Sequence, residues 1–324
     1  MAAGAAALLS LAGCGDQYRP VVTAINPVGP SSQPTKYAIA ISSTGASTAG
    51  LATMVDFSGD TVLITANVGV NPYYLALDTS GVNAYTLNSD KTLTSFPITT
   101  SLLSSQVLES TLLDNNGVLP PSINPLGTNT FLSEPGRNSV AQYAGTPLAL
   151  KQELPVDSAY TPSYVVGVAN APRVYIISPA TGGGNGEVST IETSSSTIDA
   201  NTIAVGVNPV YGVMTADTRR AFIMNRGSNN VSVINAQTNQ LDTTPTLADP
   251  NAVAPVWADF APTLNELVVA NAGDGVHQGS ISIFSIPLCS STAQPGNQCD
   301  PNNPVDAIGF GTLLANIPVG INPI

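Results

Sequence analysis

Short apolar runs alternate with small polar turns along most of the chain, and within the runs apolar and polar positions alternate with a period of two. The tract 208–235 shows this clearly. A strand-like run follows Pro209, a second covers 221–224, and a third covers 231–234 after a Gly-Ser-Asn turn. This pattern predicts half-buried antiparallel strands. No useful stretch has helical periodicity, so we expect almost no helix.

The same unit recurs along the chain, and a proline marks its beginning. Val-Gly-Val-Asn-Pro occurs at 68–72 and 205–209, and Val-Gly-Ile-Asn-Pro occurs at 319–323. Weaker or earlier markers of the same kind are Pro34, Pro125, Pro162 and Pro255. Most intervals between these prolines are near the length of a propeller blade, about 40–50 residues.

Each unit is expected to contain four strands, the last of which runs into the next proline marker. The second strands are predicted at 84–87, 174–177, 221–224 and 267–270. A single four-stranded sheet has two apolar faces and cannot bury either alone, whereas sheets stacked around an axis bury both. The sequence therefore predicts an all-β domain at 34–324, a β-propeller of four-stranded antiparallel blades.

Six units are visible, and the chain ends at 321–324 on the beginning of another. We therefore expect a seven-bladed ring that lacks its last blade. The alternative is a six-bladed ring whose last strand ends at Pro323 and Ile324.

The tract 222–235, Phe-Ile-Met-Asn-Arg-Gly-Ser-Asn-Asn-Val-Ser-Val-Ile-Asn, resembles the YVTN-type β-propeller repeat. A second copy, Leu-Val-Val-Ala-Asn-Ala-Gly, lies at 267–273, and the other units match only in the order of their strands. The resemblance covers the chain from about residue 34 to the end. Propellers of this kind usually close with seven blades.

Charged residues make up only 9% of the chain, and the net charge is −12. The nine lysines and arginines are scattered, so no basic stripe exists that could neutralise phosphates. We expect no binding to nucleic acid, and the acidic balance is accounted for by solubility. We also expect a monomer.

The N-terminus contains a short apolar run, 5–11, that ends in Leu-Ala-Gly-Cys at 11–14. This resembles the lipobox of bacterial lipoproteins, which implies a signal at 1–14, a lipid on Cys14 and a tether at 15–33. Location in the bacterial cell envelope follows, on the periplasmic or the cell-surface side, with membrane contact through the lipid alone. No basic residue precedes the run, so we expect the true start to lie upstream. The alternative is a core strand with a buried cysteine.

Cys289 and Cys299 bracket a loop that has no strand pattern. In an oxidising compartment this arrangement favours a disulfide, which would add roughly 2–3 kcal/mol of stability. The spacing is not that of a redox pair, and the only histidine is His277, so we expect no metal or cofactor here.

In a propeller, the connections between blades and the turns between second and third strands share one face. The candidate ligand-binding residues on that face are Glu134, Arg137, Asn225, Arg226, Asp274 and His277. The segments 133–138 and 224–229 occupy the same position in two units, and each carries one of the two arginines, which could bind an anionic group. Asp274 and His277 could form an acid–base pair or part of a metal site. The alternative for each residue is ordinary turn chemistry, and Trp257 is expected to pack between blades.

These features favour an exported scaffold that binds a protein or polysaccharide partner. The alternative is a hydrolase of the lactonase type at the channel mouth, because some propellers resembling this one hydrolyse sugar lactones. That chemistry needs carboxylates and usually a divalent metal or a set of histidine, arginine and glutamate around the central channel, for which the sequence offers the candidates named above. A purely structural module of a larger exported assembly is a third reading.

Overall fold

The structure, a computed structural model, describes residues 37–56, 61–98, 109–113, 116–145, 148–261, 263–276, 278–287, 299–300, 303–321 and 323. The predictions for Cys14, the tether at 15–33, His277 and Cys289 lie outside these residues. Cys299 is placed only as backbone, so the expected disulfide stays a prediction. Every named secondary-structure element within the described residues is a β-strand. These residues include no helix that is long and apolar enough to cross a membrane.

The described residues form six main antiparallel sheets that follow one another in sequence. Sheet 1 contains β1 (Tyr37–Ser42), β2 (Ala49–Asp56) and β3 (Thr61–Val70). Sheet 2 contains β4 (Pro72–Leu77), β5 (Asn83–Asn88), β6 (Thr92–Pro97) and β7 (Glu109–Leu112). Sheet 3 contains β8 (Ile123–Leu126), β9 (Asn129–Glu134), β10 (Ser139–Ala144) and β11 (Ala149–Pro155).

The second half of the chain continues the series. Sheet 4 contains β12 (Tyr164–Val166), β13 (Arg173–Ser178), β14 (Asn185–Glu192), β15 (Thr197–Ile198) and β16 (Ile203–Val207). Sheet 5 contains β17 (Pro209–Met214), β18 (Arg220–Asn225), β19 (Asn230–Asn235) and β20 (Gln240–Ala248). Sheet 6 contains β21 (Pro255–Ala261), β22 (Glu266–Asn271), β23 (Ser280–Ser285) and β26 (Leu313–Pro318). A hairpin of β24 (Cys299–Asp300) and β25 (Asn303–Ala307) is inserted before β26.

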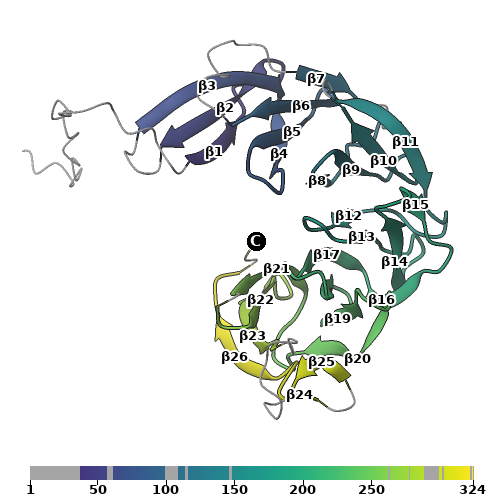
Figure 1. Ribbon diagram of the computed structural model, residues 1–324. Coiled ribbons are helices and arrows are strands. Elements are labelled where there is room, and N and C mark those ends of the chain that lie inside the picture. The colour runs from purple at the N-terminus through teal and green to yellow at the C-terminus, as the bar shows by residue number, and fades with distance from the viewer. Residues whose placement is uncertain are drawn as a thin grey trace, which may run out of the picture.

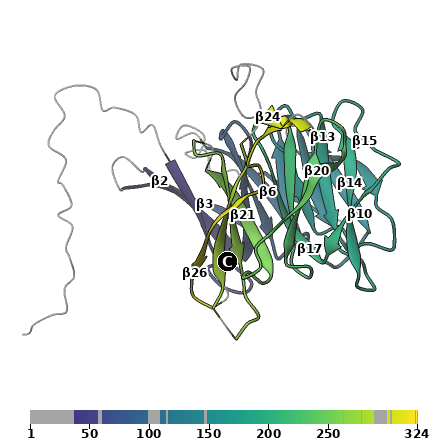
Figure 2. The same ribbon diagram turned by 90° about the horizontal axis from the view of Figure 1, so that it is seen from below.

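The six sheets are arranged in an arc around a common centre, with β4, β8, β12, β17 and β21 on the inner side (Figure 1). Viewed from below, the sheets stand side by side and their strands run between two edges of the arc (Figure 2). This is the arrangement of propeller blades, so the all-β prediction and the radial stacking are confirmed. Sheets 1 and 6 lie at the two ends of the arc (Figure 1).

The core consists of clusters between successive sheets, as two-sided burial requires. In β18, Phe222 and Met224 pack toward sheet 6, whereas Ala221 and Ile223 pack toward sheet 4. Five such clusters join the six sheets in order from 1 to 6, and none of those formed by described residues joins sheet 6 to sheet 1. Apolar burial of this kind contributes about 25 cal/mol per Å² and is the main force that holds adjacent blades together.

Two sheets differ from the expected four strands. Sheet 1 has three among the described residues. In sheet 4 the outer strand is split, because the chain leaves the sheet at 199–202 between β15 and β16, and both pieces pair with β14. The insertion before β26 also contains a short hairpin, β24–β25, which begins at Cys299, where the predicted cysteine loop ends.

The Val-Gly-x-Asn-Pro signature is explained by contacts across the boundary between two sheets. A Cβ on Gly206 would lie 2.7 Å from Cγ of Asn225 in the next sheet, and one on Gly69 would lie 2.6 Å from Cγ of Asn88. Only glycine therefore fits there. The following Asn71 and Asn208 have φ values of 47° and 50°, a left-handed conformation that asparagine tolerates better than most residues.

Candidate functional site

One edge of the arc carries both the connections between sheets and the turns after the second strands; we call it the connection edge. The two sets of loops are hydrogen-bonded to each other. The amide of Gly227 donates to the carbonyl of Val207 at 2.9 Å, and the amide of Ala272 donates to the carbonyl of Ala254 at 2.8 Å. The predicted common position of these loops is thus confirmed, and the edge has a fixed backbone.

Glu134 and Arg137 lie at the turn between β9 and β10, and both are engaged within sheet 3. Nε of Arg137 is 2.9 Å from Oε2 of Glu153 on β11 and 3.9 Å from Oε2 of Glu134. The side chain of Glu134 is only 1% exposed, and Ser139 donates to its carboxylate at 3.5 Å. Arg137 is therefore held by two carboxylates and is only one-third exposed.

Asn225 ends β18 and is fully buried. Its amide donates to Oδ1 of Asn230 and to Oγ of Ser232, both at 2.8 Å on β19. Asn271 makes the equivalent bonds to Ser280 and Ser282 in sheet 6. We call this arrangement the asparagine latch, because it ties the second strand to the third at the connection edge.

Arg226 directly follows the latch and is exposed on the connection edge. Its amide donates to the carbonyl of Asn208 at 3.0 Å, which fixes its backbone, and no described acidic side chain forms an ion pair with it. Arg226 therefore presents a cation to solvent, unlike Arg137 at the equivalent turn of sheet 3.

Asp274 lies on the connection edge of sheet 6, beside a hollow of about 240 Å³. The carboxylate accepts the amide of Val276 at 2.9 Å and is exposed. The hollow is lined by Asn251, Val253, Gly273, Asp274, Gln278, Gly279 and Ser280. Its proposed partner His277 lies outside the described residues. Of the predicted site residues that the structure describes, Glu134 and Arg137 contact each other in sheet 3. Asn225 and Arg226 lie in sheet 5, and Asp274 lies in sheet 6.

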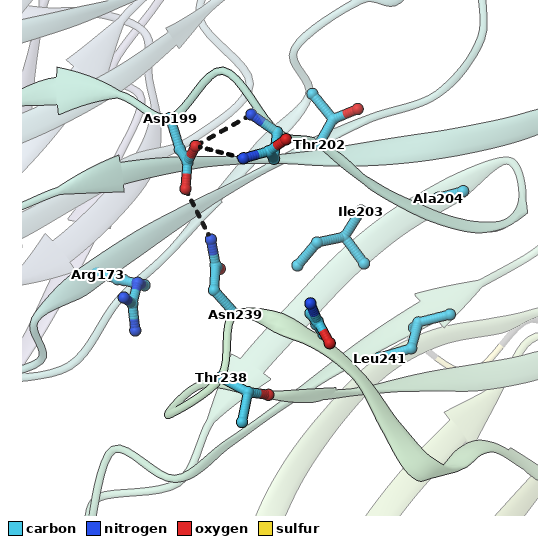
Figure 3. A pocket seen from close by; sticks show the side chains of 10 residues that line it. Arg173, Asp199, Thr202, Ile203, Ala204, Thr238, Asn239 and Leu241 are labelled. Carbon is cyan, nitrogen blue, oxygen red and sulfur yellow. Dashed lines mark hydrogen bonds between the residues drawn. The ribbon is translucent and has the colours of Figure 1, made fainter.

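A second hollow, of about 650 Å³, lies between sheets 4 and 5, where the outer strand of sheet 4 is split (Figure 3). Asp199 accepts hydrogen bonds from Asn201 and, across the sheet boundary, from Asn239 at 3.2 Å. Arg173, at its rim, binds Glu192 at 2.6 Å and the carbonyl of Ala236 at 2.8 Å. The other lining residues are Thr202, Ile203, Ala204, Thr238, Gln240 and Leu241. Sequence reasoning missed this hollow, because the hollow forms between residues of two sheets and a strand pattern reports on neighbouring residues only.

Aromatic side chains contact one another across the inner strands. The rings of Tyr164 and Tyr211 are 4.6 Å apart, and those of Tyr211 and Trp257 are 6.0 Å apart. Burial, followed by the nearby hydroxyls of Tyr74 and Tyr211, raises the pKa of Tyr164. Trp257 thus packs against the neighbouring blade, as predicted, although 43% of it stays exposed at the end of the row.

No known family model matches the sequence, and no curated protein matches it. Solved structures do resemble the fold. The hydrazine synthase of Kuenenia stuttgartiensis aligns over 87% of both chains with a TM-score of 0.59 and 16% identity. The propeller of Dos1 aligns over 82% of this chain and 66% of the other, with a TM-score of 0.57 and 11% identity. At such identities the likeness defines the fold: the chain is a β-propeller protein.

Proposed function

We propose that the protein is an exported, lipid-anchored β-propeller of the YVTN type that binds a protein or carbohydrate partner at its connection edge. The observation that supports this most is the construction of that edge. Turns and connections are bonded into one backbone surface, and exposed polar side chains of Arg226, Asp274 and Gln278 stand on it. A preorganised surface loses little conformational entropy when a partner binds.

The same geometry favours binding over lactone hydrolysis. A hydrolase would need carboxylates and arginines that are free to meet a substrate. Glu134 is almost fully buried, and Arg137 is held by Glu153 and Glu134. Holding these side chains in ion pairs opposes their use as catalytic groups.

Binding is tested by affinity capture from fractionated envelope proteins and polysaccharides, with the wild type compared with an Arg226→Ala/Asp274→Ala/Gln278→Ala variant. The control is Gln237→Ala, which is exposed on the opposite edge. Capture that is lost in the triple variant and kept in the control supports the proposal. Capture that is the same in all three proteins contradicts it, and chelator-sensitive lactone turnover would establish the hydrolase instead.

The lipid anchor is proposed on the sequence around Cys14, which lies outside the described residues. Metabolic labelling with a radioactive fatty acid, followed by membrane fractionation, tests it. Label that is incorporated by the wild type and lost in Cys14→Ser supports the anchor. A protein that fractionates with membranes without label would contradict it.

We also infer that the side of the arc between sheets 1 and 6 accommodates one further sheet, as in a seven-bladed ring. A Cβ on Gly320 of the third Val-Gly-x-Asn-Pro copy would meet nothing within 4 Å, whereas those on Gly69 and Gly206 would meet the next sheet. Spin labels on exposed Ala40 of β1 in sheet 1 and exposed Asp259 of β21 in sheet 6 test this. Packed sheets are about 10 Å apart. A distance of about 20 Å supports a place for one sheet, and about 10 Å indicates a closed ring.

A further inference from the structure

Sheet 4 lacks the asparagine latch that closes sheets 2, 5 and 6. In those sheets a buried asparagine ends the second strand and donates to the third, as Asn225 donates to Asn230. In sheet 4 the same place is taken by Ser178, and its partner in the register is Glu187 on β14. Where sheets 2, 5 and 6 have an amide donor, sheet 4 thus has a hydroxyl that faces a carboxylate.

This pair is buried and incompletely bonded. Ser178 is fully buried, and Glu187 is 5% exposed. Neither Oγ of Ser178 nor Oε1 of Glu187 has a hydrogen-bond partner. A carboxylate that is removed from water is costly unless a counter-charge or several donors compensate for it. The position therefore requires an additional positive or donating group.

The surroundings add oxygen atoms and a second negative charge. Burial, and then the carboxylate of Asp157 on the connection from sheet 3, raise the pKa of Glu187. The hydroxyls of Thr202 and Ser189 act in the opposite direction as hydrogen-bond donors. No basic side chain contributes to this balance among the described residues. Asp157 and Thr202 are exposed, so the group can be reached from solvent.

We propose that Glu187 and Asp157, with the hydroxyls of Ser178, Ser189 and Thr202, bind a calcium ion. Calcium takes six to eight oxygen ligands, among them carboxylates and waters, whereas structural zinc sites are built mainly from cysteine and histidine, which are absent from these five residues. The described residues contain no group of three or more acidic, histidine or cysteine side chains suited to a metal. Water must therefore complete the coordination, and the affinity belongs to the weak class of extracellular calcium modules, about 10⁻⁴–10⁻³ M.

Bound calcium would replace the missing latch. It would join β13 and β14 to the connection from sheet 3 and to the chain that precedes β16. The site lies within sheet 4 and its incoming connection, away from Arg226 and Asp274, so this inference stands independently of the proposed partner. Its function is to fix the connection edge at sheet 4. In sheet 3 the latch position also pairs a buried carboxylate with a hydroxyl, Glu134 with Ser139, but there Arg137 supplies a positive charge.

The test is thermal unfolding of the full chain after dialysis against a chelator, with and without 10 mM CaCl₂. At the stated affinity the melting temperature should rise by about 3–5 °C. Glu187→Gln should abolish this rise and should melt higher than the wild type in chelator, because it removes an uncompensated buried charge. The control, Glu266→Gln, changes a half-buried glutamate on β22 and should keep the full response.

The possible results distinguish calcium from a proton, a water molecule or another cation at this position. A response that survives Glu187→Gln, or an equal response to MgCl₂ or to NaCl of matched ionic strength, overturns the proposal. The proposal is also overturned if calcium leaves the melting temperature of the wild type unchanged while Glu187→Gln melts higher than the wild type in chelator. In that case a proton or a water molecule forms the missing hydrogen bond to the carboxylate. Isothermal titration with CaCl₂ provides the direct reading, with one site expected in the wild type and none in Glu187→Gln.

Discussion

Arg220 on β18 is the largest fully buried side chain in the described part of the protein, and its replacement by methionine is the sharpest test of the fold. Its guanidinium forms ion pairs with Asp242 on β20 and, at 2.8 Å, with Asp306 on β25. All three side chains are at most 3% exposed. Asp306 lies 86 residues away in sequence, so the arginine attaches the inserted hairpin to sheet 5.

The expected loss can be worked out from this geometry. Arg220→Met keeps much of the apolar volume but leaves two carboxylates buried without their cation. Removal of one partner from a buried ion pair costs about 3–5 kcal/mol. About 250 described residues have an unfolding entropy of about 0.5 kcal/mol/K, so the melting temperature should fall by about 6–9 °C.

The assay is calorimetric unfolding of the wild type, Arg220→Met, and the triple variant Arg220→Met/Asp242→Asn/Asp306→Asn. The triple variant should recover most of the loss, because no charge then stays buried. If Arg220→Met lowers the free energy of unfolding by less than about 1 kcal/mol, the claim that the ion pairs hold the hairpin is refuted. A triple variant as unstable as the single one would show that packing of the arginine stem is decisive.

Three further predictions concern single contacts. Gly206→Ala should cost about 1–3 kcal/mol in denaturant unfolding, since its Cβ would collide with the next sheet, whereas Gly320→Ala should be neutral because it meets nothing within 4 Å. Asp249→Asn should lower stability at neutral pH: burial alone would raise the pKa of this carboxyl, but hydrogen bonds from Asn316, Ser282 and the amide of Asn251 outweigh burial and lower it. The stability difference between the variant and the wild type should therefore shrink once the pH falls below 3.8, the ordinary pKa of an aspartate. It should vanish as the pH falls through the lowered pKa of Asp249 in the folded protein. Asn239→Gly should cost about 1 kcal/mol through two lost hydrogen bonds, and Asn239→Ala about 1 kcal/mol more, because its φ is 58°.

Much of the fold could be predicted because the repeat is written in local patterns. The predicted second strands at 84–87, 174–177, 221–224 and 267–270 all lie inside β5, β13, β18 and β22, and each observed strand extends one residue further at both ends. Period-two alternation and proline markers report on neighbouring residues only, and these suffice to define strands and blade order.

The candidate site was harder to predict, because its contacts join residues that are distant in sequence. The turn 134–137 resembles the turn 225–228, yet Arg137 is paired with Glu153 on another strand while Arg226 faces solvent. Likewise, Asn225 was a candidate ligand-binding residue on the basis of its turn, and only the register of β18 and β19 shows that it is buried as a latch. Its part in ligand binding stays a prediction.

The repeat also explains where specialised function should be sought. In a repetitive sequence each unit repeats the same structural solution, so departures from it mark positions under another requirement. Three departures coincide in sheet 4: Ser178 in place of asparagine, a buried Glu187 opposite it, and the detour at 199–202 that splits the outer strand. The detour ends at Thr202, whose hydroxyl acts on Glu187 and which also lines the larger hollow. A repacked, latch-restored sheet 4 with Ser178→Asn and Glu187→Ser should therefore keep the fold while it loses the calcium response, which separates the specialised group from the architecture that carries it.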